Sequence, residues 1–444
     1  MKLEQYIKEY HEGRSDWFLE EINTVASQQK VNKISDLKDY LNGSHAITQR
    51  PNEMYNGKEF VPRKIVLQYA KTLLNYQTAY LLQNPLTMTG NEGVVKEYQK
   101  VNKKGKYDRI NFNILDKVVK YGEVAEYVYL DKGMIKSKLI DPADSYPIYD
   151  HENNLIAFIE AYMLDGVDYY TVFTDDTVEK YDNLGGELRL TGRYHNLAGL
   201  PIVYNNQNEL SEVQGRSELE DWISILDSME DLISKYTDGF YKFMNPIPVA
   251  IGQQLKGDGL PSHVVGGGVN LDDGSDFKMV SNQLDYKSFE SIYKTLLQAL
   301  LDVSQTPAVS MNKTDISNLS EVSIKLLFSL ANIKAGFNEQ FMREGLEQRF
   351  DKVRRLLEYK GIKFEADEYE TLDMVFHYAM PSNDKEIIEN LKQLDEMKAI
   401  SLESVLNHSP YTNDVQMELE RLKDEGNRDE GNNQGNNLSG EEVD

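Results

Sequence analysis

The residues that could carry out chemistry are scattered along the sequence rather than grouped. Seven histidines occur in 444 residues, and no two stand four positions apart, where they would share one helix face. A histidine metal site is therefore not indicated. Acidic residues crowd at Asp272, Asp273 and Asp276, but the alternating ligands and the closing glutamate of a calcium loop are missing. We predict a solvated turn at this cluster.

Motifs for phosphate binding and nucleophilic catalysis are also missing. The glycines 266–268 lack the spacing and the strand–helix context of a dinucleotide site, and the sequence has no G-x-x-x-x-G-K-[ST] loop or G-x-S-x-G elbow. The absence of cysteine excludes disulfides, thiolate zinc sites and cysteine nucleophiles. Carboxylates are so abundant that no pair stands out as acid and base. We predict no catalytic residue, no metal and no cofactor.

The charge balance and the hydropathy pattern narrow the class of protein further. Lys and Arg number 48 against 73 Asp and Glu, which gives 48 − 73 = −25 at pH 7. Proteins that hold nucleic acid tightly neutralise phosphates with cations, so this chain should not grip DNA. The most apolar stretch, 65–82, is interrupted by polar residues, and no apolar core follows Met1. We expect neither a membrane span nor a secretion signal.

Periodicity predicts helices first and then strands in the N-terminal half. Apolar residues at steps of three and four predict a helix over 62–82, with Pro62 in its first turn and Asn84-Pro85 at its end. From 118 to 205, aromatic and β-branched runs alternate with turn dipeptides such as Asp165-Gly166. This stretch is predicted to be an antiparallel β-rich layer.

A heptad pattern begins after Asn208 and predicts a long helix. Apolar residues recur there at alternating steps of three and four, which favours packing against another helix, in the same chain or in a second copy. A single amphipathic helix on its own domain remains open at this point. The residues of this seam are Leu219, Trp222, Leu226, Met229, Ile233, Tyr236, Phe240 and Phe243.

The remaining elements follow in an order unusual for an enzyme. A small β-type segment is expected before a second helix that starts near Tyr286, and a polar loop follows at about 305–320. Ser320 can cap a long helix over 321–360, in which Gly336 and Gly345 are candidate bends. Alternating apolar residues predict a strand that ends at Pro381, and short helices and a polar, disordered tail should complete the chain.

Several segments, taken in order, resemble the portal proteins of tailed double-stranded DNA bacteriophages. Tyr80-Leu81-Leu82-Gln83-Asn84-Pro85 resembles the family's yllGNP segment, with Gln83 in place of the usual glycine. The segments that resemble the family's wing layer and its returning strand are 122–129, 140–142, 146–150 and 376–381. Each motif is weak alone, and their order over most of the chain makes the resemblance specific.

The resemblance implies an α+β, mainly α fold of portal type. The implied parts are a mixed α/β wing at 1–208, a first stem helix at 209–244, a clip containing β structure at 245–285, a second stem helix at 286–304, a tunnel loop at 305–320, a tunnel helix and returning wing strand at 321–381, a helical crown at 382–424 and a disordered acidic tail at 425–444.

The resemblance also implies a function without catalysis. A ring of usually twelve copies at one capsid vertex would pass double-stranded DNA non-specifically during packaging and ejection, with the terminase large subunit, a head-completion adaptor, the major capsid protein and the scaffolding protein as partners. The ring would form in the host cytoplasm and remain in the virion. The residues expected to face DNA are Gln305, Thr306, Val309, Met311, Asn312 and Lys313, and those expected in subunit packing are Leu219, Trp222, Leu226, Met229, Ile233 and Tyr236.

One alternative of another class stays open from the residues. The many carboxylates could bind Mg²⁺ in an acidic DNA-processing enzyme that cleaves phosphodiesters. Metal-dependent cleavage of plasmid DNA would separate the two hypotheses, and we expect none.

Overall fold

A computed structural model describes most of the chain. The described residues are 1–55, 58–243, 247–252, 273–280, 285–307, 320–412, 415, 417–419 and 421–423. They divide into two compact units. Unit 1 comprises Met1–Thr306 and Leu330–Ala379, and unit 2 comprises Pro307–Ser329 and Met380–Asp444.

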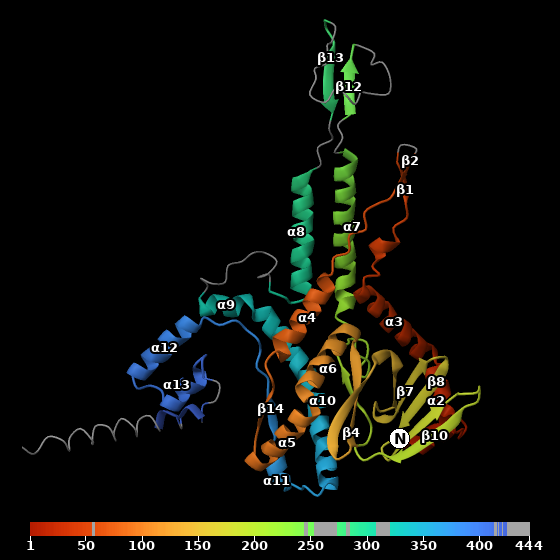
Figure 1. The fold of residues 1–444 in the computed structure, drawn as a ribbon, viewed down its shortest axis with the longest axis vertical. Helices are drawn as coiled ribbons and strands as arrows, with labels where there is room; N and C mark the ends of the chain where they lie inside the picture. Colours follow the sequence, from red (N-terminus) through yellow and green to blue (C-terminus); the bar gives the residue numbers. More distant parts are fainter. Residues whose placement is uncertain are drawn as a thin grey trace, which may run out of the picture. The chain divides into compact units, whose positions relative to one another are not determined.

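Unit 1 begins with helices and a short hairpin (Figure 1). These elements are α1 (Leu3–Tyr10), α2 (Trp17–Ile22), α3 (Val25–Asn42), the 3-10 turn η1 (Ala46–Gln49), β1 (Glu53–Tyr55), β2 (Lys58–Phe60) and α4 (Tyr69–Leu82). The helix predicted from Pro62 therefore starts seven residues later, at Tyr69. The backbone N–H groups of Arg63, Ile65 and Leu67 donate to side chains of another helix, so they are not available for helical bonds.

The predicted β layer is confirmed, although its first residues belong to a helix. Helices α5 (Glu92–Gly105) and α6 (Tyr107–Tyr121) precede it. A three-stranded sheet has the order β11-β4-β5, a five-stranded sheet has the order β10-β9-β8-β7-β6, and all pairs are antiparallel. The strands are β4 (Glu123–Asp131), β5 (Met134–Ile140), β6 (Ser145–Tyr149), β7 (Leu155–Leu164), β8 (Val167–Phe173), β9 (Thr177–Asp182), β10 (Arg189–His195) and β11 (Ile202–Asn205), with the 3-10 turn η2 (Pro142–Asp144) between β5 and β6.

Two long helices lie side by side, and the segment of sequence that joins them contains a small hairpin (Figure 1). Helix α7 spans Leu219–Phe243 and α8 spans Tyr286–Val303. Strands β12 (Ile247–Ile251) and β13 (Asp276–Val280) pair antiparallel in the segment between the two helices. The order helix, β-type segment, returning helix agrees with the sequence prediction.

The last part of unit 1 is dominated by α10 (Ser329–Tyr359), followed by α11 (Ala366–Tyr369) and β14 (Asp373–Val375), which pairs with β3 (Thr87–Thr89). The helix predicted as one piece from Glu321 is interrupted at Phe328, where the chain leaves helical geometry. Helix α10 runs without a break through Gly336 and Gly345, the two candidate bends. A Cβ on Gly345 would lie 2.2 Å from the ring of Tyr204, so close packing requires this glycine.

The described part of unit 2 is helical. It contains α9 (Glu321–Leu327), α12 (Asp384–Glu396) and α13 (Leu402–His408). Ser320 caps α9 through the backbone N–H of Ser323, as predicted. The carboxylate of Glu386 accepts the N–H of Glu321, and the carboxylate of Glu321 accepts the N–H of Asn383, so α9 and α12 cap each other. The tail predicted to be disordered at 425–444 lies outside the described residues.

Candidate functional site around helix α7

The segment before α7 is a structured loop, not the start of a stem helix. Helix α7 begins at Leu219, ten residues after the start predicted at 209. The side chain of Asn206 donates to the carbonyl of Arg216 at 2.9 Å, and that of Asn208 donates to the carbonyl of Gln214 at 2.7 Å. These short polar side chains bond the loop backbone to itself, which offers an alternative to helical bonds.

Two glycines let this loop pack directly onto the junction of α6 and β4. The N–H of Asn206 donates to the carbonyl of Gly122 at 2.7 Å, and the N–H of Glu218 donates to the carbonyl of Val119 at 3.1 Å. A Cβ on Gly215 would lie 1.8 Å from the carbonyl oxygen of Gly122, so no side chain fits there. The loop is thus fixed to the junction at which β4 begins.

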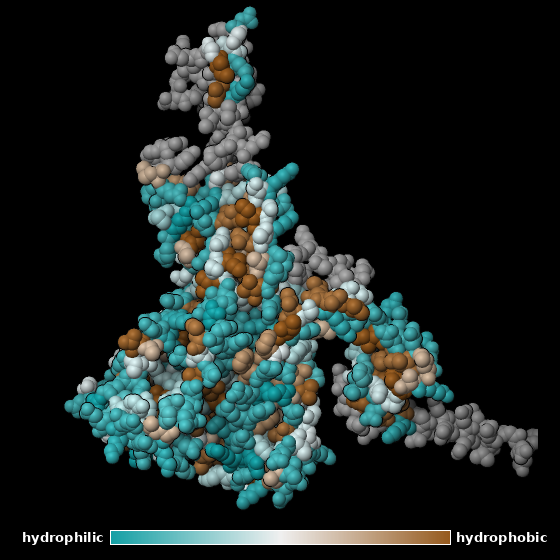
Figure 2. Space-filling view, turned by 180° about the vertical axis from the view of Figure 1, so that it is seen from behind, coloured by the Kyte–Doolittle hydropathy of each residue, from teal (hydrophilic) through white to brown (hydrophobic). Residues whose placement is uncertain are grey.

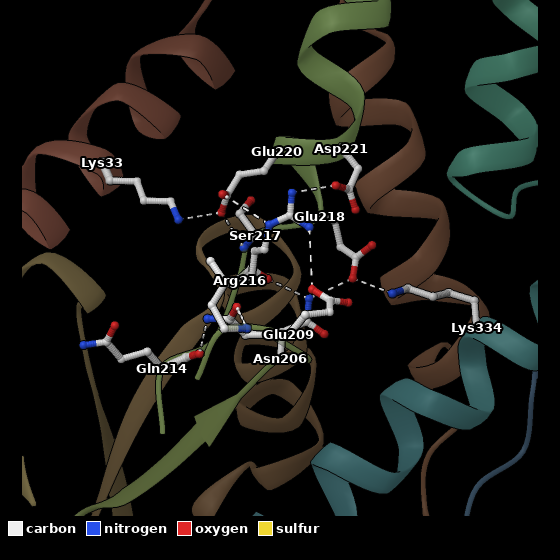
Figure 3. Close-up of polar contacts among 12 residues, drawn as sticks. Lys33, Asn206, Glu209, Gln214, Arg216, Ser217, Glu218, Glu220, Asp221 and Lys334 are labelled. Carbon is white, nitrogen blue, oxygen red and sulfur yellow. Dashed lines mark hydrogen bonds and ion pairs between the residues drawn. The ribbon is translucent and has the colours of Figure 1, made fainter. Parts of the chain in front are cut away.

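Ion pairs converge on the first turn of α7 from two distant helices (Figure 3). Lys33 of α3 contacts Glu220 at 2.8 Å, and Lys334 of α10 contacts Glu218. Arg216 binds Asp221 at 2.6 Å. Acidic side chains at a helix N-terminus also interact favourably with the helix dipole. We call Arg216, Glu218, Glu220, Lys33 and Lys334 the base cluster. It joins α3, α7 and α10.

A second ion pair, deep inside unit 1, joins α10 to the three-stranded sheet. The guanidinium of Arg349 contacts Glu126 of β4 at 2.8 Å, and both side chains are almost completely buried. Tyr204 of β11 donates its hydroxyl to the same carboxylate at 2.7 Å, and Asn111 of α6 accepts from Arg349. Burial raises the pKa of Tyr204 well above its usual value, which keeps the hydroxyl a donor. We call these four residues the Arg349 cluster.

One flank of α7 holds an extended segment of the chain. Glu230, Ser234 and Asp238, spaced by four, are buried on the same helix face. Their oxygens accept the N–H groups of Leu67 at 2.7 Å, Ile65 at 3.0 Å and Arg63 at 2.9 Å, respectively. Four helical residues rise about 6 Å and two extended residues about 6.6 Å, so the two spacings match. We call residues 63–67 the strap.

His45 completes this flank. Its ring stacks on that of Tyr40, with centroids 3.8 Å apart, and its Nδ1 lies 2.7 Å from Oε1 of Glu230. The histidines are scattered in the sequence, which does not indicate this contact, because it joins residues 185 positions apart. The polar residues Glu230, Ser234 and Asp238, spaced by four on the predicted helix, were the available indication. Such a stripe lies apart from the apolar seam, and its polar groups need partners if they are buried.

The seam residues of α7 pack mainly against other residues of the same chain. Leu219, Trp222, Leu226 and Met229 are fully buried, and the single chain supplies their packing partners. The heptad was expected to pack helices within and between subunits, and its part between subunits stays a prediction. The other two residues predicted for subunit packing are less deeply buried. Ile233 is half-buried, and Tyr236 stacks on Phe289 of α8 with centroids 3.9 Å apart.

Of the six residues predicted to face DNA, the structure describes only Gln305 and Thr306. Gln305 has a positive φ of 52° directly after α8, and the N–H of Thr306 donates to the carbonyl of Leu301 at 3.0 Å. A helix that ends with a residue in the left-handed backbone conformation shows this pattern, so both residues belong to the C-terminal cap of α8. The carbonyl of Ser304 beside them accepts from Gln77 of α4. Val309, Met311, Asn312 and Lys313 lie outside the described residues.

Within the described ranges, no helix combines the length and the apolar run needed to cross a bilayer. The fold is mixed α/β. A buried ion pair joins α10 to the three-stranded sheet, and a side-chain-to-backbone bond joins α7 to the strap. In both places the polar groups hold elements of the fold together.

The chain belongs to the phage portal protein family described as SPP1 Gp6-like, whose family model matches residues 24–432. Members of this family are structural components of the phage capsid and not enzymes. A portal protein of Bacillus phage SPP1 is 22% identical over 391 residues, which cover 81% of this chain and 75% of the relative. The Mg²⁺-dependent enzyme considered above is therefore set aside.

Chains in solved particles of gene transfer agents match this chain with TM-scores below 0.5. The neck of a native particle, computed with C12 symmetry, matches with 10% identity and a TM-score of 0.45, over 76% of this chain and 87% of that chain. The neck of an empty particle, computed with C6 symmetry, matches with 11% identity and a TM-score of 0.48, over 77% of this chain and 89% of that chain.

Proposed function

We propose that copies of this chain form a ring, usually of twelve, at one capsid vertex, and that double-stranded DNA passes through the ring during packaging and ejection. The observation that carries this proposal is the family match over 24–432. The paired helices α7 and α8, with a β hairpin in the segment that joins them, support it independently, because they agree with the stem and clip expected from the sequence.

The parts of the chain are proposed to act as wing, stem, clip, tunnel and crown. The wing would comprise 1–208, with the returning strand that follows the tunnel helix, and the stem would comprise α7 and α8. The clip would comprise 245–285, the tunnel loop 305–320 and the crown 382–424. The start of the first stem helix is moved to Leu219, because the residues before it form the loop described above.

Contact between copies is proposed to use apolar surface that the single chain leaves exposed. Side chains of this kind lie on the α7–α8 pair (Figure 2), among them Phe240, Ile292 and Val303, which are about half exposed. Leu330, Ile333 and Phe337 are exposed on α10 at helical spacing. Ordered rows of exposed apolar residues of this kind are typical of interaction surfaces.

The charge of the chain suits a conduit rather than a DNA-binding protein. Each copy carries −25, so a ring would repel a polyanion at distances below the screening length and would not capture it. The tunnel loop, with Gln305, Thr306, Val309, Met311, Asn312 and Lys313, is proposed to form a sequence-neutral constriction. Replacing Val309 and Met311 with Asp should leave ring assembly intact and reduce DNA packaging.

The partners are proposed from the same function. The terminase large subunit would drive DNA through the ring, an adaptor would bind the clip, and the capsid and scaffolding proteins would surround the wing. Within one subunit, the base cluster and the Arg349 cluster join α10 to both the stem and the wing. We propose that a displacement of the tunnel helix α10 is transmitted to the stem through the base cluster and to the wing through the Arg349 cluster.

Native mass spectrometry with negative-stain imaging of the same fraction tests the proposal. We expect a particle near twelve times 51.0 kDa with a central hole. Incubation of that fraction with plasmid DNA and Mg²⁺ should leave the DNA intact. A compact monomer or dimer that cuts the plasmid would contradict the proposed function.

A further inference from the structure

Both ring nitrogens of His45 face hydrogen-bond acceptors in a site closed to solvent. Nδ1 lies 2.7 Å from Oε1 of Glu230, and Nε2 lies 2.9 Å from the carbonyl oxygen of Tyr40. The side chains of His45 and Glu230 have no exposed surface. Because a carbonyl oxygen cannot donate, Nε2 must carry a hydrogen. The contact between Nδ1 and Oε1 then needs a hydrogen of its own, on one atom or the other.

A metal ion in place of that hydrogen fits the geometry less well. Asp227 adds a third possible ligand, and ligand atoms of the three residues lie within 4.8 Å of one another. However, two ligands bound to one ion at about 2.0–2.1 Å lie about 2.9–3.3 Å apart, which is wider than the contact between Nδ1 and Oε1. Oε1 of Glu230 is also already the acceptor of the Leu67 N–H at 2.7 Å. The separation is that of a hydrogen bond.

We propose that His45 and Glu230 keep one proton between Nδ1 and Oε1, and that this proton clamps the strap onto helix α7. The same oxygen receives the His45 proton and the Leu67 N–H, so the position of the carboxylate serves both contacts. Without the proton, a nitrogen lone pair and a carboxylate would face each other in a site without water, which is strongly unfavourable.

The clamp has little freedom to relax in another way. Stacking on Tyr40, with the two rings 10° from parallel, holds the plane of the imidazole. The bond from Nε2 to the Tyr40 carbonyl fixes its rotation. Loss of the proton therefore displaces the Glu230 carboxylate, and with it the acceptor of the Leu67 N–H.

The charged and titratable groups around the pair favour keeping the proton. Burial raises the pKa of Glu230, and the nearby Asp227 carboxylate acts in the same direction. Burial also raises the pKa of Tyr40, whose hydroxyl donates to Asp227 at 3.4 Å. The clamped state binds one proton more than the released state, so rising pH favours release of the strap.

Hydrogen exchange of the full chain, followed by mass spectrometry on peptides that cover the strap, tests this proposal. After correction for intrinsic exchange, protection of the strap amides should fall about tenfold from the lowest to the highest pH at which the chain stays folded, because a bond to a charged acceptor is lost. Protection of the seam residues of α7 should not change over this range.

Two variants separate the proton from other causes. In Glu230→Gln, the single atom in the position of Oε1 can accept from Leu67 or donate to Nδ1 of a neutral His45, but it cannot do both, so protection of the strap should be low and should not change with pH. In His45→Phe, protection should be low at every pH. His151→Gln is the control, because His151 is exposed and its variant should behave as the parent does.

Each contrary result is decisive. Strap protection that does not change with pH in the parent chain would overturn the proposal, and so would a pH dependence that persists in Glu230→Gln. Faster exchange after addition of EDTA, reversed by Zn²⁺, would assign the site to a metal ion instead. If His45→Phe does not fold, the parent chain and Glu230→Gln still decide the question.

Discussion

The Arg349 cluster and the base cluster join elements that are distant in sequence, and both use ion pairs, but they differ in exposure. Arg349 and Glu126 are almost completely buried. At the base of α7, the Lys33 side chain is 52% exposed and its partner Glu220 is 22% exposed. The energetic consequence of this difference is large, because a buried charge that loses its partner cannot be solvated, while an exposed charge can. The loss of one partner should therefore cost more stability at the ion pair between the three-stranded sheet and α10 than at the pair between α3 and α7.

Breaking the buried pair should have the largest effect. Arg349→Met leaves the Glu126 carboxylate without its cation inside the protein, and we expect a loss of about 3–5 kcal/mol in the free energy of unfolding of unit 1. Urea unfolding checks this through the fluorescence of Trp17 and Trp222, both of which lie in unit 1. The double variant Arg349→Met, Glu126→Leu is the matched control and should recover part of the loss. Equal losses in the single and double variants would mean that packing, and not charge, holds the cluster.

Gly345 tests the packing of the same cluster without changing its charges. In Gly345→Ala, the new Cβ meets the Tyr204 ring, whose hydroxyl bonds Glu126, so the ring or the helix must move. Overpacking of this kind costs about 1–3 kcal/mol, measured by the same urea unfolding. Gly336→Ala on the same helix is the control, because its nearest neighbour is 3.9 Å away, and it should be neutral or slightly stabilising. A similar loss in both variants would point to helix bending instead.

Breaking a contact on the flank of α7 should cost an amount of stability between the costs at the two clusters, because the contact at the centre of this flank is buried but uncharged. Ser234→Ala removes the acceptor of the Ile65 N–H and leaves that donor unsatisfied, so we expect a loss of about 1–2 kcal/mol. Ser228→Ala is a control on the same helix, because the Ser228 hydroxyl is exposed and bonds only the local carbonyl of Ser224 among the contacts of the described chain. An equal effect in both variants would show that Ser234 acts through helix propensity.

The sequence predicted the elements that depend on local periodicity. Alternation and turn dipeptides located the strands between Glu123 and Asn205, and the steps of three and four from Leu219 onward located the seam of α7. These patterns follow from burial of one face of each element, which a single stretch of sequence records. The capping of α9 by Ser320 was also predictable, because an N-cap depends on the residue type at a single position.

The sequence did not predict features that depend on distant partners. The start of α7 at Leu219 depends on a loop fixed against Gly122, and the late start of α4 depends on acceptors 163 to 175 residues further along the chain. Gly345 looks like a helix bend in sequence, but its role is set by a tyrosine on strand β11. The channel residues from Val309 to Lys313 stay predictions, because they lie outside the described residues.

Breaking the exposed ion pair between Lys33 and Glu220 should cause the smallest loss of stability, and this loss should depend most strongly on salt. Lys33→Ala removes one partner of Glu220, which keeps a second contact to Arg216 at 3.4 Å, so we expect a loss of no more than about 0.5 kcal/mol. That loss should vanish when the ionic strength is raised to about 1 M, where the screening length is only about 3 Å. The loss caused by Arg349→Met should persist at the same salt concentration, because buried pairs are screened far less. Comparable salt sensitivity of the two losses would show that water and ions reach both clusters, and that the difference in burial does not set their strengths.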